Sequence, residues 1–124
     1  MANLVGLKIS LCQMPVVPGR PDLNTAYIEK EIFSAVERGS DIIIFPEMKD
    51  GYALGDRFEN DSFIMDIQRH NVQICKSTQN GIAAIWGSVV ADTKKKGRDG
   101  RMRKYNAGIG AQNGKWIGKT FKTL

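Results

Sequence analysis

Residues 42–45, Ile-Ile-Ile-Phe, followed directly by Pro46 and Glu47, constrain the fold of this chain more than any other stretch. A short apolar run of β-branched and aromatic residues is typical of a strand buried on both faces. Pro46 has no backbone N–H to donate, so the strand is expected to end there. Glu47 then lies at the carboxyl end of a buried strand, where ligand sites gather in open α/β sheets. We expect it to be partly removed from water and to suit a general base, although an exposed loop glutamate fits the same stretch.

The residues before this strand predict a β-α-β unit. Residues 4–14 carry alternating apolar side chains, which indicates a first strand, and residues 15–21 contain prolines and a glycine that break regular structure. Residues 22–38 predict a helix that Asp22 caps and Gly39 ends. Two strands joined through a helix over this length are expected to be parallel, with a right-handed crossover.

The rest of the chain predicts a second helix and three more strands. Asn113-Gly114 between two strand-like runs is a strong hairpin signal. The expected elements are a loop over residues 49–60, a helix from Asn60 or Asp61 to about Asn80, and strands over residues 82–90, 102–112 and 115–121.

The order β-α-β-α-β-β-β predicts a single α/β domain in which a mixed sheet carries both helices on one face. Strands as apolar as residues 42–45 and 82–90 need cover on both faces, and two helices packed together cover only one. The sequence also stops at Leu124, directly after a predicted strand. We therefore expect half of a layered fold, with the remainder on the same polypeptide or on a separate second half.

Composition excludes several classes of protein. The chain is 42% hydrophobic and 25% charged, has no apolar run long enough to span a membrane, and lacks the basic and apolar regions of a secretory signal. Two cysteines and one histidine form no metal-ligand pattern. These observations favour a cytoplasmic protein with reduced, structural cysteines, no bound metal and no membrane partner.

Positive charge is concentrated near the end of the chain. Residues 92–122 hold ten Lys or Arg against two Asp, a net charge of +8 within an overall +5. The run from Lys94 to Arg98 precedes Asp99-Gly100, a turn signal, and is interpreted as the solvated tip of a hairpin. It contains no aromatic residue and no nucleic-acid-binding motif, so we expect no nucleic-acid partner.

Two segments match motifs of one enzyme superfamily. Ile44-Phe-Pro-Glu47 places a glutamate after an apolar strand, and residues 115–124 place Lys122 at the end of another. They resemble the nitrilase (carbon–nitrogen hydrolase) superfamily, whose members use a Glu-Lys-Cys triad on an α-β-β-α sandwich. The resemblance assigns Glu47 to the family's glutamate and Lys122 to its lysine. The family's cysteine segment lies further along and has no match in these residues.

Four segments narrow the resemblance to one branch. They are similar to the glutaminase domain of glutamine-dependent NAD synthetases, and they cover about the first half of that domain and none of the synthetase domain. The spacer Met48-Lys-Asp50 is about one residue shorter than in that branch, which affects where Tyr52 lies. The segments are Gly51-Tyr-Ala-Leu-Gly-Asp-Arg-Phe58, Trp86-Gly-Ser-Val89, Gly97-Arg-Asp-Gly-Arg-Met-Arg-Lys-Tyr-Asn-Ala107 and Lys122-Thr-Leu124.

This resemblance implies hydrolysis of the glutamine side-chain amide through a thioester, with ammonia passed to a second active site. Glu47 would be the general base and Lys122 would stabilise the oxyanion. Tyr52 would line the substrate pocket or the ammonia path, unless it only packs on its loop. Cys12 and Cys75 lie inside a predicted strand and a predicted helix, so neither is expected to be the nucleophile. The 124 residues alone are therefore expected to be inactive.

The resemblance also implies cofactors and partners. No cofactor is expected in this part of the protein, whereas a synthetase domain would use ATP and magnesium. Glutamine is the expected substrate, and the protein is expected to form a homo-oligomer. Three other interpretations stay open: part of a stand-alone amidase of the same superfamily, a non-catalytic half-domain that acts by assembly, and a basic binding module.

Overall fold

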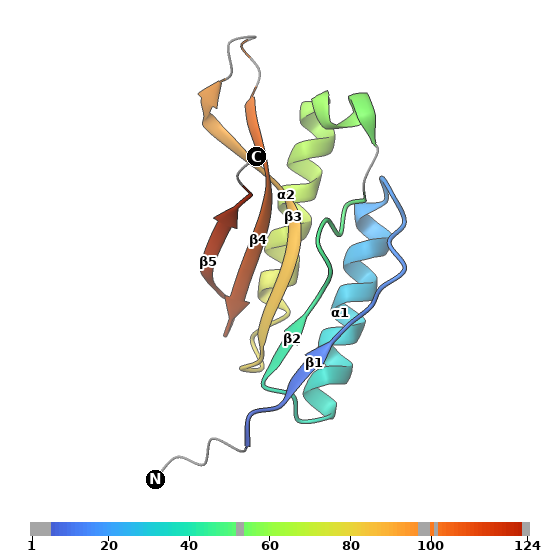
Figure 1. Ribbon diagram of the computed structural model, residues 1–124, viewed down its shortest axis with the longest axis vertical. Helices are drawn as coiled ribbons and strands as arrows, with labels where there is room; N and C mark the ends of the chain where they lie inside the picture. The colour runs from blue at the N-terminus through green and yellow to red at the C-terminus, as the bar shows by residue number, and fades with distance from the viewer. Residues whose placement is uncertain (1–5, 52–53, 97–99, 101, 123–124) are drawn as a thin grey trace.

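The structure is a computed structural model that describes residues 6–51, 54–96, 100 and 102–122. Its strands and helices alternate at first and end in an antiparallel meander (Figure 1). The elements are β1 (Ile9–Leu11), α1 (Pro21–Glu37), β2 (Ile42–Ile44), the 3₁₀ helix η2 (Gly55–Glu59), α2 (Asp61–Lys76), β3 (Ala83–Lys96), β4 (Met102–Gln112) and β5 (Lys115–Phe121).

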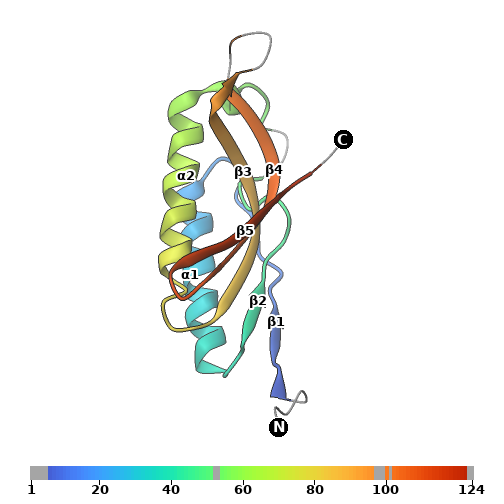
Figure 2. The ribbon, with the colours of Figure 1, turned by 90° about the vertical axis from the view of Figure 1, so that its left-hand side faces the viewer.

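The five strands form one mixed sheet in the order β1-β2-β3-β4-β5. The first three are mutually parallel, and β3, β4 and β5 are antiparallel neighbours. Both helices pack on the same face of the sheet, and no helix of the described residues covers the other face (Figure 2). This arrangement confirms the predicted α/β class, the order β-α-β-α-β-β-β and the one-sided helix layer.

Buried side chains of the two helices meet alternate residues of the central strands. Ile28 and Ile32 of α1 and Ile74 of α2 are essentially inaccessible, as expected from their spacing along one helix face. They belong to a core cluster that includes Ile43 and Trp86 from the sheet. Packing of these apolar faces against the sheet stabilises the two helices.

Strand pairing assigns residues to the two faces of the sheet. Laterally paired residues share a face, and Ile43 pairs with Ala84, both of which are fully buried under the helices. The next pair, Ile44 and Ile85, therefore lies on the opposite face, where Ile85 is 42% exposed. We call this side of the sheet the open face.

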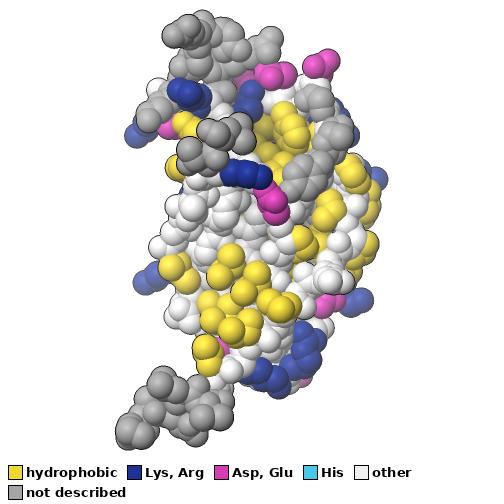
Figure 3. Space-filling view, viewed as in Figure 1, with side chains coloured by type: hydrophobic (Ala, Val, Ile, Leu, Met, Phe, Trp, Pro, Cys, Tyr) yellow, Lys and Arg dark blue, Asp and Glu magenta, His cyan; other side chains and the backbone are white. Residues whose placement is uncertain are grey.

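Apolar side chains gather on the open face. Figure 3 shows them over β1, β2 and β3, in front of the sheet and away from the helices. Leu11, which pairs with Ile44, is 77% exposed, and Ile9 is exposed as well. Exposed apolar patches of this kind mark interaction surfaces.

Several element boundaries differ from the sequence-based expectation. Among the described residues the first strand covers three residues rather than the predicted range 4–14, because its partner β2 is itself only three residues long. Residues 4 and 5 of that range lie outside the described residues. Helix α1 begins at Pro21 after Arg20, and Asp22 pairs with the Arg20 guanidinium instead of capping the helix. The predicted loop over residues 49–60 contains η2.

The other predicted boundaries are closer to the structure. Asn60 caps α2 by accepting a hydrogen bond from the Phe63 N–H at 3.0 Å, although the helix ends at Lys76 rather than near Asn80. Strand β3 extends to Lys96, so the first lysines of the basic run belong to the strand. Lys96 pairs with Met102, which confirms the hairpin, while its predicted tip lies outside the described residues at positions 97–99 and 101.

No helix in the described ranges has the length and hydrophobicity that crossing a bilayer requires.

Gly87 allows the segment after β2 to approach β3 closely. A Cβ at this position would lie 2.6 Å from the Met48 backbone nitrogen, whereas a Cβ at Gly108 on β4 would meet nothing within 4 Å. We expect Gly87→Ala to lower the free energy of unfolding by about 1–3 kcal/mol through overpacking, measured by urea denaturation. Gly108→Ala is the matched control, and an equal effect of both changes would show that close packing at Gly87 is not the cause.

Candidate active site on the open face

Glu47 lies at the point where β2 leaves the sheet. Phe45 still donates its N–H to the Ile85 carbonyl at 2.8 Å, as a strand residue would. Pro46 then ends the regular ladder, and the Gly87 N–H reaches the Pro46 carbonyl at 3.3 Å. This places Glu47 beside the middle of β3, at the carboxyl end of the parallel part of the sheet, as predicted.

Lys122 reaches the same place from the end of β5. Its backbone N–H donates to the Asn106 carbonyl of β4 at 2.8 Å, so the lysine is still held by the sheet. Its Nζ donates to Glu47 Oε1 at 3.1 Å, across a separation of 75 residues. The structure thus brings together the two site residues that the sequence analysis selected.

Asn106 is a third member of this site that the sequence analysis did not select. Its Nδ2 donates to Glu47 Oε1 at 2.6 Å, so Asn106 and Lys122 share one carboxylate oxygen. The only sequence signal was its place in an Arg-Lys-Tyr-Asn segment on a predicted strand. Its orientation depends on the β3–β4 register, which pairs it with Val89.

A shallow cavity of about 280 Å³ surrounds the Glu47–Lys122 contact. Its floor includes Gly87 and Gly108 of β3 and β4, the larger Phe45, Ile85 and Trp86 also line it, and Thr120 borders it beside Lys122. Glycines on the floor leave room for another group to approach the carboxylate from outside the sheet. The cavity therefore presents a carboxylate, an ammonium and an amide to whatever covers the open face.

A second cavity of about 430 Å³ touches the other side of Glu47. Its remaining lining comes from loops and is apolar, with Met14, Val16 and Pro18 facing Pro46 and Met48. Tyr52, which was predicted to line the substrate pocket or ammonia path, lies outside the described residues.

Glu47 is partly removed from water. Its side chain is 50% exposed and that of Lys122 is 55% exposed. The reason is that, among the described residues, helices cover only the opposite face, so the sheet and its loops shield the pair from one side. A cover on the open face would shield the carboxylate further, which suits a general base.

Both cysteines are at least partly buried. Cys75, on α2, is buried in the core, and Cys12 is partly buried against the same cluster. Burial raises the pKa of both thiols above the ordinary value, and the nearby Glu31 carboxylate adds to the effect at Cys12. A raised pKa means less thiolate at neutral pH, so neither side chain has the environment of a nucleophilic cysteine.

The raised thiol pKa values predict slow alkylation of the folded chain. We expect Cys12 and Cys75 to react with iodoacetamide at pH 7 more slowly than free cysteine, because the thiolate is the reacting species and its fraction falls as the pKa rises. The rate should increase as the pH is raised through 9. Mass spectrometry of timed samples measures this, and the urea-unfolded chain is the control. Fast labelling of either folded cysteine at pH 7 would contradict the prediction.

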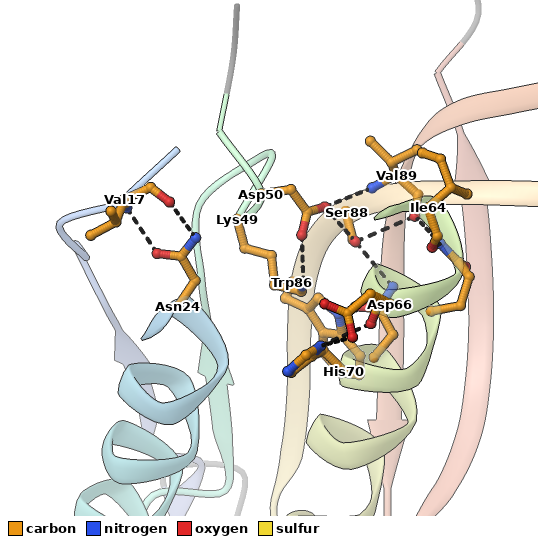
Figure 4. A network of polar contacts seen from close by, with 12 residues as sticks. Val17, Asn24, Lys49, Asp50, Ile64, Asp66, His70, Trp86, Ser88 and Val89 are labelled. Carbon is orange, nitrogen blue, oxygen red and sulfur yellow. Dashed lines mark hydrogen bonds and ion pairs between the residues drawn. The ribbon is translucent and has the colours of Figure 1, made fainter. Parts of the chain in front are cut away.

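A buried polar network holds the segment that follows Glu47. Asp50 accepts hydrogen bonds from Lys49 Nζ at 2.6 Å, Ser88 Oγ at 2.7 Å and the Val89 N–H at 3.0 Å (Figure 4). The network continues into α2, where Asn71 Nδ2 donates to Ser88 Oγ at 3.0 Å. Each of these side chains is buried, so the network ties the loop to the centre of the fold.

The described ranges contain no cluster of three or more His, Cys, Asp or Glu side chains that could hold a metal ion. The described side chains at the Glu47–Lys122 contact supply a carboxylate, an ammonium and a carboxamide, with the Thr120 hydroxyl at the border of the cavity. That set can accept a proton and stabilise an anion, but it includes no cysteine thiolate.

The fold is similar to parts of solved NAD synthetase and amidase structures. The match to a glutamine-dependent NAD(+) synthetase from Cytophaga hutchinsonii covers 95% of this chain, with a TM-score of 0.81 and 20% sequence identity. The match to the glutamine-dependent NAD+ synthetase from Acinetobacter baumannii covers 95% of this chain, with a TM-score of 0.71 and 22% identity. The match to a cysteine-to-serine mutant of the Nesterenkonia AN1 amidase, from the nitrilase superfamily, covers 98% of this chain, with a TM-score of 0.74 and 20% identity.

This chain spans only part of each of those proteins. It covers 19% of the C. hutchinsonii synthetase, 21% of the A. baumannii synthetase and 46% of the amidase. No protein-family model matches the sequence, and no curated protein matches it either. The comparisons therefore establish a partial nitrilase-like fold for this chain.

Proposed function

We propose that this chain supplies the glutamate and lysine of a cysteine-dependent amide hydrolase of the nitrilase type, acting as a glutaminase. The observation that carries the proposal is the contact between Glu47 and Lys122, 75 residues apart, at the ends of two strands on the open face. The partial nitrilase-like fold supports it independently of those two residues. The cysteine would come from a second half of the fold, on the same polypeptide or on another.

In this proposal Glu47 takes the proton from the cysteine thiol, and the thiolate attacks the amide carbon of the substrate. Lys122 Nζ stabilises the negative charge on the oxygen of the tetrahedral intermediate. As that intermediate collapses, protonated Glu47 gives its proton to the leaving nitrogen, so that the C–N bond breaks, ammonia leaves, a thioester remains and Glu47 is a carboxylate again. Glu47 then activates a water molecule that hydrolyses the thioester to the carboxylic acid. Asn106 holds Glu47 Oε1 in place while the proton is transferred.

The open face is where the second half would bind. Its apolar residues and its glycine floor would pack against another sheet, as in the α-β-β-α sandwich that the fold resembles. Such a cover would bury the half-exposed Glu47 and Lys122 side chains together. It would also place a cysteine near the 280 Å³ cavity that now opens to solvent.

Glutamine is favoured as the substrate because the segments around Gly51, Trp86 and Asn106 resemble the glutaminase branch. The ammonia would then serve a synthetase domain that uses ATP and magnesium, to which no residue of this chain is assigned. Assembly of copies into a homo-oligomer is part of the same proposal.

A stand-alone amidase is the second candidate. The amidase structure matches 98% of this chain, and the apolar cavity of about 430 Å³ beside Glu47 would suit the hydrocarbon part of a simple amide. The two candidates differ in substrate and not in the roles of Glu47 and Lys122. The ratio of kcat/KM for L-glutamine to kcat/KM for propionamide distinguishes them.

Ammonia release tests the proposal directly. We expect the purified 124-residue chain to release none from L-glutamine above the blank, and we expect hydrolysis once a cysteine-bearing second half is supplied in the same polypeptide or as a separate chain. Hydrolysis by the 124 residues alone that is abolished in Glu47→Gln would refute the need for a second half. Absence of hydrolysis of any amide by the assembled protein would refute the proposed activity.

A further inference from the structure

We infer that Asp50, neutralised by Lys49, positions Glu47 by anchoring the turn that carries it to the centre of β3. The distances to Asp50 and the burial of its partners carry this inference. Its importance for catalysis rests on the proposed function, whereas the positioning of Glu47 does not.

The backbone after Glu47 is held in a conformation that needs an anchor. Met48 has a backbone φ of +53°, in the left-handed region that residues other than glycine rarely adopt. The chain nevertheless stays against β3, because the Lys49 N–H donates to the Gly87 carbonyl at 2.8 Å. A residue in this region persists where the surrounding contacts fix it. Those contacts decide where Glu47 points.

Asp50 supplies three further contacts that hold the turn. Its carboxylate accepts from Lys49 Nζ, Ser88 Oγ and the Val89 N–H, three donors from two segments. The Lys49 and Asp50 side chains are 0% and 1% exposed, so these bonds have no competition from water. Figure 4 shows both side chains directed into the space between the loop and β3. The turn between Pro46 and Gly51 is thereby fixed at its far end.

Ser88 of β3, which donates to Asp50, also connects the turn to the helix layer. Ser88 accepts from Asn71 Nδ2 at 3.0 Å, and Asn71 Oδ1 accepts from Trp86 Nε1 at 3.0 Å. Asn71 is a buried residue of α2, so these hydrogen bonds connect the turn to the helix layer through β3. A buried ion pair is a costly way to stabilise a fold, and fixing one local geometry is a use that would account for it here.

Nuclear magnetic resonance of the Glu47 and Asn106 side chains tests the inference in the 124-residue chain. The variants are Lys49→Met/Asp50→Asn, which removes both charges, and Ser88→Ala, which removes one donor to Asp50. We expect the double variant to lose the shifted Asn106 Nδ2–H resonance that reports the bond to Glu47, and the Glu47 carboxyl carbon shift to move toward that of a free glutamate. Ser88→Ala should cause a smaller shift in the same direction.

Asp41→Asn is the matched control, because Asp41 Oδ2 also receives a backbone N–H, that of Lys8 at 2.7 Å, but at the opposite end of β2. It should leave both resonances unchanged. A merely structural role for Asp50 would lower the unfolding midpoint without changing these resonances in the folded protein. Unchanged resonances in Ser88→Ala and the double variant would overturn the inference, and if the double variant does not fold, Ser88→Ala decides. None of these outcomes depends on whether an amide is hydrolysed, so a failure of the proposed function is seen separately.

Discussion

Glu47→Gln is expected to lower kcat for amide hydrolysis by about 10³-fold, within the 10²–10⁴-fold range of general acid–base catalysis. The amide oxygen of glutamine can still accept from Asn106 and Lys122, so the geometry is retained while the base is lost. The measurement is steady-state ammonia release by the enzyme assembled with its cysteine-bearing half. Because the thiol proton has no other acceptor in the proposed mechanism, kcat should fall more than KM changes.

Lys122→Met is also expected to lower kcat for amide hydrolysis. Loss of one oxyanion donor costs about 10²–10³-fold in kcat. Lys119→Met is the matched control, since Lys119 lies on the same strand, three residues earlier, with its Nζ over the Trp116 ring. Equal losses in the two lysine variants would show that general positive charge on β5, and not the contact with Glu47, supports activity. Retention of wild-type kcat in Glu47→Gln would exclude Glu47 as the base.

Lys49→Met is expected to lower the free energy of unfolding by about 3–5 kcal/mol, the cost of leaving one member of a buried ion pair without its partner. The Asp50 carboxylate would keep Ser88 and the Val89 N–H but would lose the charge that neutralises it. Urea denaturation followed by tryptophan fluorescence measures the change, since Trp86 belongs to the same network.

The matched control removes a surface cation in the same way. Arg69 pairs with Asp66 on α2, but 75% of the Arg69 side chain is exposed. Arg69→Met should therefore change the free energy of unfolding by less than about 1 kcal/mol. A loss at Lys49 no larger than that at Arg69 would show that the buried pair contributes little to stability.

The element order was predictable because it depends on local patterns. The apolar run at residues 42–45, the helical spacing of Ile28 and Ile32, and the Asn113-Gly114 turn each determine an element from a few neighbouring residues. The expected position of Glu47 followed from Pro46, which ends the ladder whatever the neighbouring strands are. Strand lengths were harder to predict, because the extent of β1 depends on how much of β2 is available to pair with it.

The sequence by itself determined the α/β class, the order of elements and the lack of a nucleophilic cysteine pattern. It offered Glu47 as a candidate, and the resemblance to the nitrilase superfamily added Lys122. Only the tertiary structure decided that Glu47 meets Lys122 at 3.1 Å, that Asn106 joins them, and that a buried Lys49–Asp50 pair anchors the turn behind them. The physical reason is register: β3, β4 and β5 must pair in one alignment before residues distant in sequence share a face. That alignment is set by long-range packing, which a local pattern does not encode.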